Sequence, residues 1–192
     1  MTTVTVVKKE GRVAIAADTL TKWGGGKESA DYVANHEKII RVGDSFVAIT
    51  GSATFKLILA DYFAGLETPQ LDSVPEIFRV WNRMHSVLKE QYYLQTGEDK
   101  EEDLESSRMD VLIANANGIF GVAAHRMVQE FSRFYAYGSG SPYALGAMYA
   151  AYRAPSLDAE SIARLGVAAA AEFHDETGLP IHSFALNLKE NG

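Results

Sequence analysis

The chain has 192 residues, of which 47% are hydrophobic, and this suits one globular domain with a sizeable core. It contains no cysteine, which excludes a disulfide scaffold, a thiolate zinc site and a cysteine nucleophile. The formal net charge is −7, and residues 97–107 supply −5 of it through six acids and one lysine. The acidity therefore belongs mostly to one solvated loop, and no strong basic patch predicts a nucleic-acid partner.

The start of the chain and its apolar stretches argue against secretion and membrane insertion. Residues 1–11 do not show a charged segment followed by an apolar run, as a signal peptide would. No charge-free apolar stretch reaches the ~18 residues that a membrane-spanning helix needs. We therefore expect a cytoplasmic protein without a membrane partner, which the lack of cysteine also fits.

The first fifty residues predict two pairs of strands. Residues 2–7 alternate and are rich in Thr and Val, and residues 13–17 form the returning strand after a glycine turn. Residues 18–35 are polar and contain three consecutive glycines, which predicts a long loop. Residues 38–42 and 45–50 form the second pair around a tight turn.

The middle of the chain predicts two helices and then three strands. Apolar residues at helical spacing predict helices over residues 53–66 and 74–93. After the acidic loop, strands are predicted over residues 109–115, 119–123 and 131–137. A turn of Asn and Gly residues joins the first two of these strands.

Two more helices and a last strand complete the pattern. The helices are predicted over residues 142–152 and 158–174, and Ser156 or Asp158 can cap the second. Residues 181–188 are predicted to form the last strand. Strand pairs joined by tight turns favour antiparallel sheets, and helices that arrive in pairs favour covering layers outside those sheets. The sequence thus predicts an α+β fold, a four-layer αββα sandwich, in a single domain over residues 1–192.

Thr2 is a candidate nucleophile if Met1 is removed. Methionine is commonly trimmed before a small residue, and Thr qualifies. Trimming would expose an α-amine, with a pKa of about 7.7–8.0, on the residue that carries the hydroxyl. The amine could then accept the hydroxyl proton, directly or through water, which makes this residue both nucleophile and base. Thr is common at position two, so this feature alone does not establish catalysis.

Asp18 and Lys38 are candidates for tuning that amine. Asp18 follows one hydrophobic strand and Lys38 opens another. A lysine near the amine would lower the pKa of the amine through like-charge repulsion and would stabilise an alkoxide on Thr2. An aspartate beside the lysine would hold it charged and oriented. When each residue is considered alone, an ordinary salt bridge at a strand end is a better explanation than a role in catalysis.

The glycine-rich segment 137–144 (YGSGSPYA) lets the backbone turn closely into the start of a helix. Its amides could bind an anion, or Ser139 could hydrogen-bond a nearby amine or a catalytic water. A phosphate-cradling loop is the rival interpretation, but the segment lacks the lysine of the Walker pattern.

A polar cluster near the C-terminus could be a metal site or the capped end of a helix. Its spacing matches no zinc pattern, and a helix end with a polar cap is the favoured interpretation. The cluster consists of His174, Asp175, Glu176, Thr177 and His182.

Together these segments resemble the proteasome β-subunit and HslV family of N-terminal-nucleophile threonine peptidases, and they look most similar to the betaproteobacterial proteasome homologues. The resemblance covers nearly the whole chain. It is carried by residues 2–4 (TTV), 17–21 (ADTLT), 38–42 (KIIRV), 47–51 (VAITG) and 138–144 (GSGSPYA).

The resemblance implies a catalytic role for four residues. Thr2 corresponds to the nucleophile, with its own amine as the base. Asp18 and Lys38 correspond to the pair that tunes this amine, and Ser139 corresponds to the serine that hydrogen-bonds near it.

The resemblance also implies residues that bind substrate. The family's oxyanion hole uses a backbone N–H that falls at Ala48, where family members often have glycine. Thr21 and Thr50 lie where the family pairs its backbone with an extended substrate. Phe46 is expected to wall the pocket for the residue before the cut.

No cofactor is required by the resemblance, but it implies a cation site. Proteasome β subunits usually carry Asp-x-x-Ser before the late glycine, where this chain has His174 and Thr177, and HslV also has a Thr there. In HslV this turn can bind a monovalent cation through backbone oxygens. A monovalent cation is therefore predicted near Ala171, His174 and Thr177.

The resemblance implies a threonine-type endopeptidase that cleaves unfolded polypeptides inside a double homo-oligomeric ring of six or seven subunits per ring. An ATP-dependent unfoldase is the partner it implies. Two alternatives stay open, namely a ring-forming scaffold subunit without proteolytic activity and a small-molecule amidase on the same fold. The sequence does not define the cleavage preference, the ring number or the unfoldase.

Overall fold

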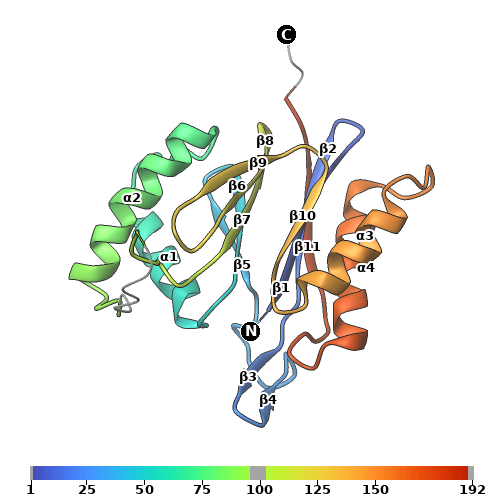
Figure 1. Ribbon diagram of the computed structural model, residues 1–192, viewed down its shortest axis with the longest axis horizontal. Helices are drawn as coiled ribbons and strands as arrows, with labels where there is room; N and C mark the ends of the chain where they lie inside the picture. The colour runs from blue at the N-terminus through green and yellow to red at the C-terminus, as the bar shows by residue number, and fades with distance from the viewer. Residues whose placement is uncertain (1, 96–102, 190–192) are drawn as a thin grey trace.

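Two antiparallel sheets stack face to face, and each is covered on its outer side by a pair of helices (Figure 1). The computed structural model describes residues 2–95 and 103–189. Met1 and part of the predicted acidic loop, residues 97–102, lie outside the described residues. The predicted α+β sandwich with four layers in the order αββα is confirmed.

The first sheet has four strands and contains the start of the chain. The hairpin of its two central strands has buried apolar runs because both faces of this sheet are covered. In spatial order its strands are β10 (Phe134–Gly138), β1 (Thr3–Lys9), β2 (Arg12–Ala17) and β11 (His182–Asn187).

The second sheet has five strands that follow one another in chain order. Every neighbouring pair is antiparallel. Tight turns join the first strand to the second and the third strand to the fourth, as predicted. Its strands are β5 (Ile39–Val42), β6 (Ser45–Ile49), β7 (Val111–Asn115), β8 (Gly118–Val122) and β9 (Val128–Phe131).

The helices cover the two sheets in pairs, as their order in the chain predicts (Figure 1). Helices α1 (Thr54–Ala64) and α2 (Val74–Glu90) pack on the second sheet, where the indole of Trp81 is buried against Phe63. Helices α3 (Ser141–Ala151) and α4 (Ala159–Phe173) pack on the first sheet. No helix within residues 2–95 and 103–189 is long and apolar enough to cross a membrane.

A third apolar cluster fills the space between the sheets. Val4 and Ile15 of the first sheet meet Leu112 and Ile119 of the second, and all four are fully buried. On the other side of β1, the Thr5 hydroxyl donates to the carbonyl of Ala163 in α4 at 2.9 Å. Thr is therefore compatible with the helix-facing side of this buried strand because its hydroxyl has an acceptor.

Two sequence predictions are wrong in detail. The predicted long loop over residues 18–35 contains a hairpin of β3 (Thr21–Trp23) and β4 (Gly26–Glu28), which is too short and too exposed to show an alternating pattern. The single strand predicted over residues 131–137 is two strands, β9 and β10, in different sheets. The chain changes sheet there without a glycine or proline to mark the turn.

The N-cap of α4 tests how the sequence sets a helix boundary. The Asp158 carboxylate accepts a hydrogen bond from the Ser161 amide at 2.8 Å, and this bond lowers the pKa of Asp158. We predict that Asp158→Ala lowers the free energy of unfolding by about 1 kcal/mol at neutral pH because one amide of the first turn loses its acceptor. The measurement is urea denaturation followed by circular dichroism.

Asp158→Asn is the matched control, since its side-chain oxygen still accepts the bond while the ion pair with Arg12 at 3.5 Å is lost in both variants. The carboxylate's lowered pKa means that its contribution is present above the unfolded pKa and is lost as the pH falls through the folded pKa. Equal destabilisation of the two variants would contradict the capping role.

Candidate active site

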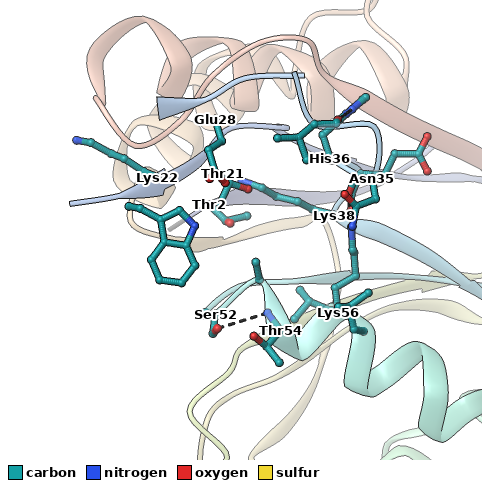
Figure 2. A pocket seen from close by; sticks show the side chains of 17 residues that line it. Thr2, Thr21, Lys22, Glu28, Asn35, His36, Lys38, Ser52, Thr54 and Lys56 are labelled. Carbon is teal, nitrogen blue, oxygen red and sulfur yellow. Dashed lines mark hydrogen bonds between the residues drawn. The ribbon is translucent and has the colours of Figure 1, made fainter. Parts of the chain in front are cut away.

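A cavity of about 370 Å³ opens beside the start of the chain, between the two sheets' ends and the β3–β4 hairpin. Thr2 lies on its wall together with Thr21 and Lys38 (Figure 2). The segment from Ile49 into α1 supplies the opposite wall. The cavity therefore brings together residues that are far apart in the sequence, including three of the predicted site residues.

Thr2 is fixed by the register between β1 and β10. Thr3 pairs with Gly138 at the end of the β1–β10 ladder, so Thr2 directly precedes one of these paired residues and Ser139 directly follows the other. Gly138 has a φ of +98°, and a Cβ built on it would lie 1.9 Å from the Thr2 carbonyl oxygen. Only glycine allows this close approach of the two backbones.

Asp18 is fully buried and, among the residues that the structure describes, accepts four hydrogen bonds from four parts of the chain. One oxygen, Oδ1, accepts from the Thr3 amide and from the Lys38 ammonium, both at 2.9 Å. The other, Oδ2, accepts from the amides of Leu20 at 3.1 Å and Gly178 at 3.2 Å. These bonds satisfy a carboxylate that would otherwise be costly to bury.

Lys38 carries its ammonium into the same place. The side chain is 11% exposed, and its Nζ donates to Asp18 and, at 2.6 Å, to the Leu20 carbonyl. Figure 2 shows the side chain reaching from the residue before β5 toward Thr2. Burial lowers the pKa of Lys38 below its ordinary value, while the charge and hydrogen bond of Asp18 act in the opposite direction.

A second hydrogen-bonded contact supports the strand from the helix side. The Thr3 hydroxyl and the Thr177 hydroxyl lie 2.7 Å apart, and both residues are buried. Thr177 Oγ1 is in turn 3.5 Å from His174 Nδ1. Gly140 packs directly on this pair, because a Cβ built on it would lie 2.2 Å from Thr3 Oγ1.

The chain is similar to solved proteins over nearly its full length, although no model of a protein family matches it. BPH of Thiobacillus denitrificans is 79% identical over 98% of this chain and 100% of that chain, with a TM-score of 0.95. The same protein in complex with epoxomicin is 80% identical over 97% and 99%, with a TM-score of 0.93. This chain belongs to the BPH family of betaproteobacterial proteasome homologues.

The fold is also that of a more distant protein. HslV from Trypanosoma brucei is 17% identical over 96% of this chain and 99% of that chain, with a TM-score of 0.69. At this identity the similarity shows the fold alone. The four-layer sandwich of this BPH family member is therefore that of HslV and the proteasome subunits.

Not all predicted site residues of this BPH family member reach the cavity. Ser139 is exposed and follows Gly138 directly. Ala48 is buried in β6, where it pairs with Ile39 and Leu112 on either side. Ala48 is also absent from the residues that line the cavity within the described part of the chain.

Phe46 and Thr50 also make contacts other than those predicted. The Phe46 ring stacks on Phe184 of β11 with centroids 4.4 Å apart. The Thr50 amide donates to the Asp110 carbonyl at 2.9 Å, and the Thr50 hydroxyl donates to the same carbonyl at 3.2 Å. Neither residue lines the cavity among the described residues, whereas Thr21 does.

Gly51 and Lys56 line the cavity and were missed by the sequence analysis. Gly51 has a φ of +100°, and a Cβ there would lie 2.9 Å from the Arg108 carbonyl oxygen. The glycine directly after a buried strand was the signal that could have identified it. No sequence signal identified Lys56, since it is an ordinary polar position on a predicted helix.

The predicted cation site stays a prediction. Ala171 lies in the last turn of α4, where carbonyls lack a partner within the helix, and this suits a cation. The His174 carbonyl accepts the Thr177 amide at 3.2 Å and retains a second lone pair. The residues present therefore fit a cation bound through backbone oxygens.

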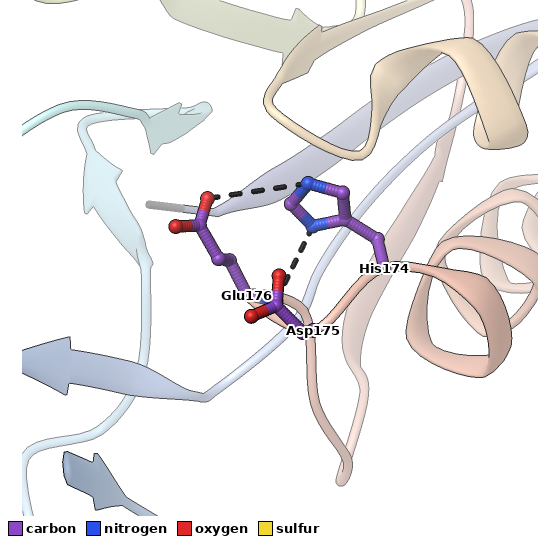
Figure 3. Close-up of side chains that lie close together, drawn as sticks. All are labelled: His174, Asp175 and Glu176. Atoms are coloured by element: carbon purple, nitrogen blue, oxygen red, sulfur yellow. Dashed lines mark hydrogen bonds and ion pairs between the residues drawn. The ribbon is translucent and has the colours of Figure 1, made fainter. Parts of the chain in front are cut away.

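The side chains of His174, Asp175 and Glu176 also lie close together (Figure 3). Most of their atoms already have partners. His174 Nδ1 accepts from the Glu176 amide at 3.3 Å, and Asp175 pairs with Lys22 at 2.5 Å. The Lys22 pair also lowers the pKa of Asp175, and these contacts support the helix end with a polar cap that the sequence indicates.

The close packing at Gly140 gives a test of the site's rigidity. We predict that Gly140→Ala lowers the free energy of unfolding by about 1–3 kcal/mol, because the new methyl group overlaps the Thr3 and Thr177 hydroxyls. Urea denaturation at neutral pH measures this change.

Gly146→Ala is the control, since that glycine lies within α3 and a Cβ there meets nothing within 4 Å. It should raise the free energy of unfolding by up to about 1 kcal/mol through helix propensity. Similar effects of the two substitutions would show that the space around Gly140 is not restricted.

Proposed function

We propose that this chain is a threonine-type endopeptidase whose nucleophile is Thr2 after Met1 has been removed. The observation that carries the proposal is the position of Thr2 at a cavity, directly beside a buried Asp18–Lys38 pair. Family membership supports it, because N-terminal-nucleophile chemistry is what the resemblance to proteasome subunits implies.

The proposed first step is attack of the Thr2 hydroxyl on a peptide carbonyl. The free α-amine accepts the hydroxyl proton as Oγ forms its bond to the carbonyl carbon. The nearby Lys38 cation keeps the amine's pKa low enough for a large neutral fraction at pH 7–8. The amine then gives the proton to the departing amine of the substrate, which leaves an acyl-enzyme ester on Thr2.

The second step is hydrolysis of this ester. A water molecule attacks the ester carbonyl while the α-amine of Thr2 accepts its proton. The proton returns to Oγ as the ester bond breaks, so the acid product leaves and the enzyme is restored. No group outside the chain other than water is needed.

The negative oxygen formed in both steps needs hydrogen-bond donors. The Gly51 amide is a better candidate than the predicted Ala48 amide, because Gly51 lines the cavity and Ala48 lies within paired strands. The positive φ of Gly51 also permits a backbone orientation that a residue with a side chain rarely adopts. A backbone N–H placed there would lower the transition-state energy.

The proposed substrate is an unfolded polypeptide bound in an extended conformation. Thr21 in β3 lines the cavity and offers backbone groups beside Thr2. The T. denitrificans BPH is known in complex with epoxomicin, which supports the use of the same ligand as a probe of this chain. The proposed partner is an ATP-dependent unfoldase, which would supply such unfolded substrates.

The decisive test combines the N-terminal mass with the activity of a Thr2 variant. We predict that mass spectrometry shows loss of Met1 and that epoxomicin adds its mass to the trimmed chain. Thr2→Ala should lower peptide hydrolysis by about 10³-fold or more, because it removes the nucleophile. The readout is hydrolysis of fluorogenic peptides that vary in the residue before the cut.

Thr2→Ser is the matched control, since it keeps a hydroxyl beside the amine and should retain measurable activity. Lack of labelling in chains shown to be trimmed would reject the peptidase and leave the scaffold role. Full activity of Thr2→Ala would place the chemistry elsewhere in the chain.

We also propose that the chain assembles into a double ring, which would enclose the Thr2 sites and keep folded proteins away from them. The HslV-like fold supports ring formation. We predict a particle with twelve or fourteen times the mass of one chain, measured by light scattering after gel filtration. A monomer or dimer at micromolar concentration would contradict the ring and would favour the small-molecule amidase.

A further inference from the structure

The segment directly before Lys38 is held from the helix side by a lysine of α1. Lys56 lines the same cavity as Lys38 (Figure 2). Its ammonium donates to the Glu37 carbonyl at 2.8 Å and to the Asn35 carbonyl through a short hydrogen bond. Two of its three donors therefore bind the backbone within three residues of Lys38.

The same segment is held on its other side by β11. The Glu37 carboxylate lies 3.4 Å from His182 Nδ1, and the rings of His36 and His182 have centroids 5.1 Å apart. The His36 ring is itself fixed, since its Nδ1 lies 2.6 Å from the Val33 carbonyl oxygen. Residues 35–37 are thus attached to α1 on one side and to the first sheet on the other.

These contacts matter because the position of Lys38 depends on the backbone that precedes it. Lys38 lies between residues 35–37 and β5, which begins at the next residue, and its ammonium must meet both Asp18 and the Leu20 carbonyl. A shift of residues 35–37 would move the start of the Lys38 side chain. The buried Asp18 carboxylate cannot follow, because three backbone amides also hold it.

The positive charge of Lys56 also affects Lys38, in addition to the hydrogen bonds that hold the backbone before it. The charged and titratable groups facing Lys56 are Glu37 and Lys38, with His36 and His182 behind Glu37 and Asp18 behind Lys38. Burial is the main cause that lowers the pKa of Lys38, and the Lys56 charge adds to it. Burial also lowers the pKa of Lys56 itself.

We propose that Lys56 is a positioning residue for Lys38: by binding the carbonyls of Asn35 and Glu37 it fixes the backbone that aims the Lys38 ammonium at Asp18 and Thr2. This inference rests on the proposed function in so far as Lys38 acts on the Thr2 amine. Lys56 itself does not contact the reacting atoms in this assignment.

The test compares Lys56→Met, which removes the donors and the charge, with Lys56→Arg, which keeps both. Lys27→Met is the matched control, because Lys27 is an exposed cation of the β3–β4 hairpin that does not line the cavity. All variants are produced as full chains, and loss of Met1 is verified by mass. Thermal unfolding shows whether each variant is folded.

The first measurement is amide hydrogen exchange and does not depend on activity. Lys56→Met should raise exchange across residues 33–39 by roughly 10-fold or more, because the local opening energy falls with two lost hydrogen bonds. Lys56→Arg and Lys27→Met should exchange like the wild type. Unchanged exchange in Lys56→Met would overturn the proposal.

The second measurement is kcat/KM against pH for peptides that differ only in the residue before the cut. Lys56→Met should lower kcat/KM by roughly 10- to 100-fold for every peptide, because the Lys38 ammonium is misplaced. The Lys56 charge helps to lower the pKa of Lys38. The acid limb of the Lys56→Met profile should move to higher pH, since in the proposed mechanism a cation beside the Thr2 amine keeps that amine neutral. A fold that is merely weakened would not move this limb.

Two outcomes separate the alternatives. A loss confined to peptides with an acidic residue before the cut would overturn the proposal, because Lys56 would then bind substrate. Increased exchange in Lys56→Met, together with a wild type that is trimmed but inactive and unlabelled, would support the positioning role and reject the peptidase.

Discussion

The structure depends on the burial of one carboxylate, that of Asp18. Its two oxygens accept hydrogen bonds from β1, from the loop after β2, from the residue that precedes β5 and from the turn after α4. Removing the Lys38 ammonium would leave a buried charge unpaired, which costs about 3–5 kcal/mol, and losing one of the amide donors would cost about 1–3 kcal/mol. The loop after β2, the entry to β5 and the C-terminal turn are therefore held to the strand that carries Thr2.

Close backbone approach on the other side of Thr2 completes this constraint. Gly138 contacts the Thr2 carbonyl, and Gly140 contacts the Thr3 hydroxyl, at distances that no side chain allows. Thr2 is thus enclosed between the Asp18 network and the glycine turn that leads into α3. With Thr2 as the proposed nucleophile, this enclosure would limit the conformational entropy that is lost on reaction, which is the advantage of preorganised sites.

The sequence predicts the layers and the centre of the site, but it does not predict the cavity wall. The strand-end positions of Asp18 and Lys38 were predictable because each follows or opens a strongly apolar strand, whereas their place in a site came from the resemblance. The wall opposite Thr2 depends on where β6 ends. Ala48 and Gly51 are only three residues apart, yet one is paired on both sides and the other lies at the cavity.

The predicted substrate contacts of Phe46 and Thr50 stay predictions, although neither residue lines the cavity among the described residues. Because side chains alternate between the two faces of a strand, a small shift in alignment moves a residue from one face to the other. Phe46 consequently faces the space between the sheets, where it stacks on Phe184, instead of the cavity. Lys56 was unpredictable for a different reason, since its acceptors are backbone carbonyls that no side-chain pattern records.

Two ion pairs near the site differ in how far they are exposed to solvent. Asp18–Lys38 is buried, whereas Lys22–Asp175 joins the β3–β4 hairpin to the turn after α4 with its carboxylate largely exposed. Water and salt screen the exposed pair but not the buried one. The Asp18–Lys38 pair therefore holds its segments together more strongly than the Lys22–Asp175 pair holds the β3–β4 hairpin to the turn after α4.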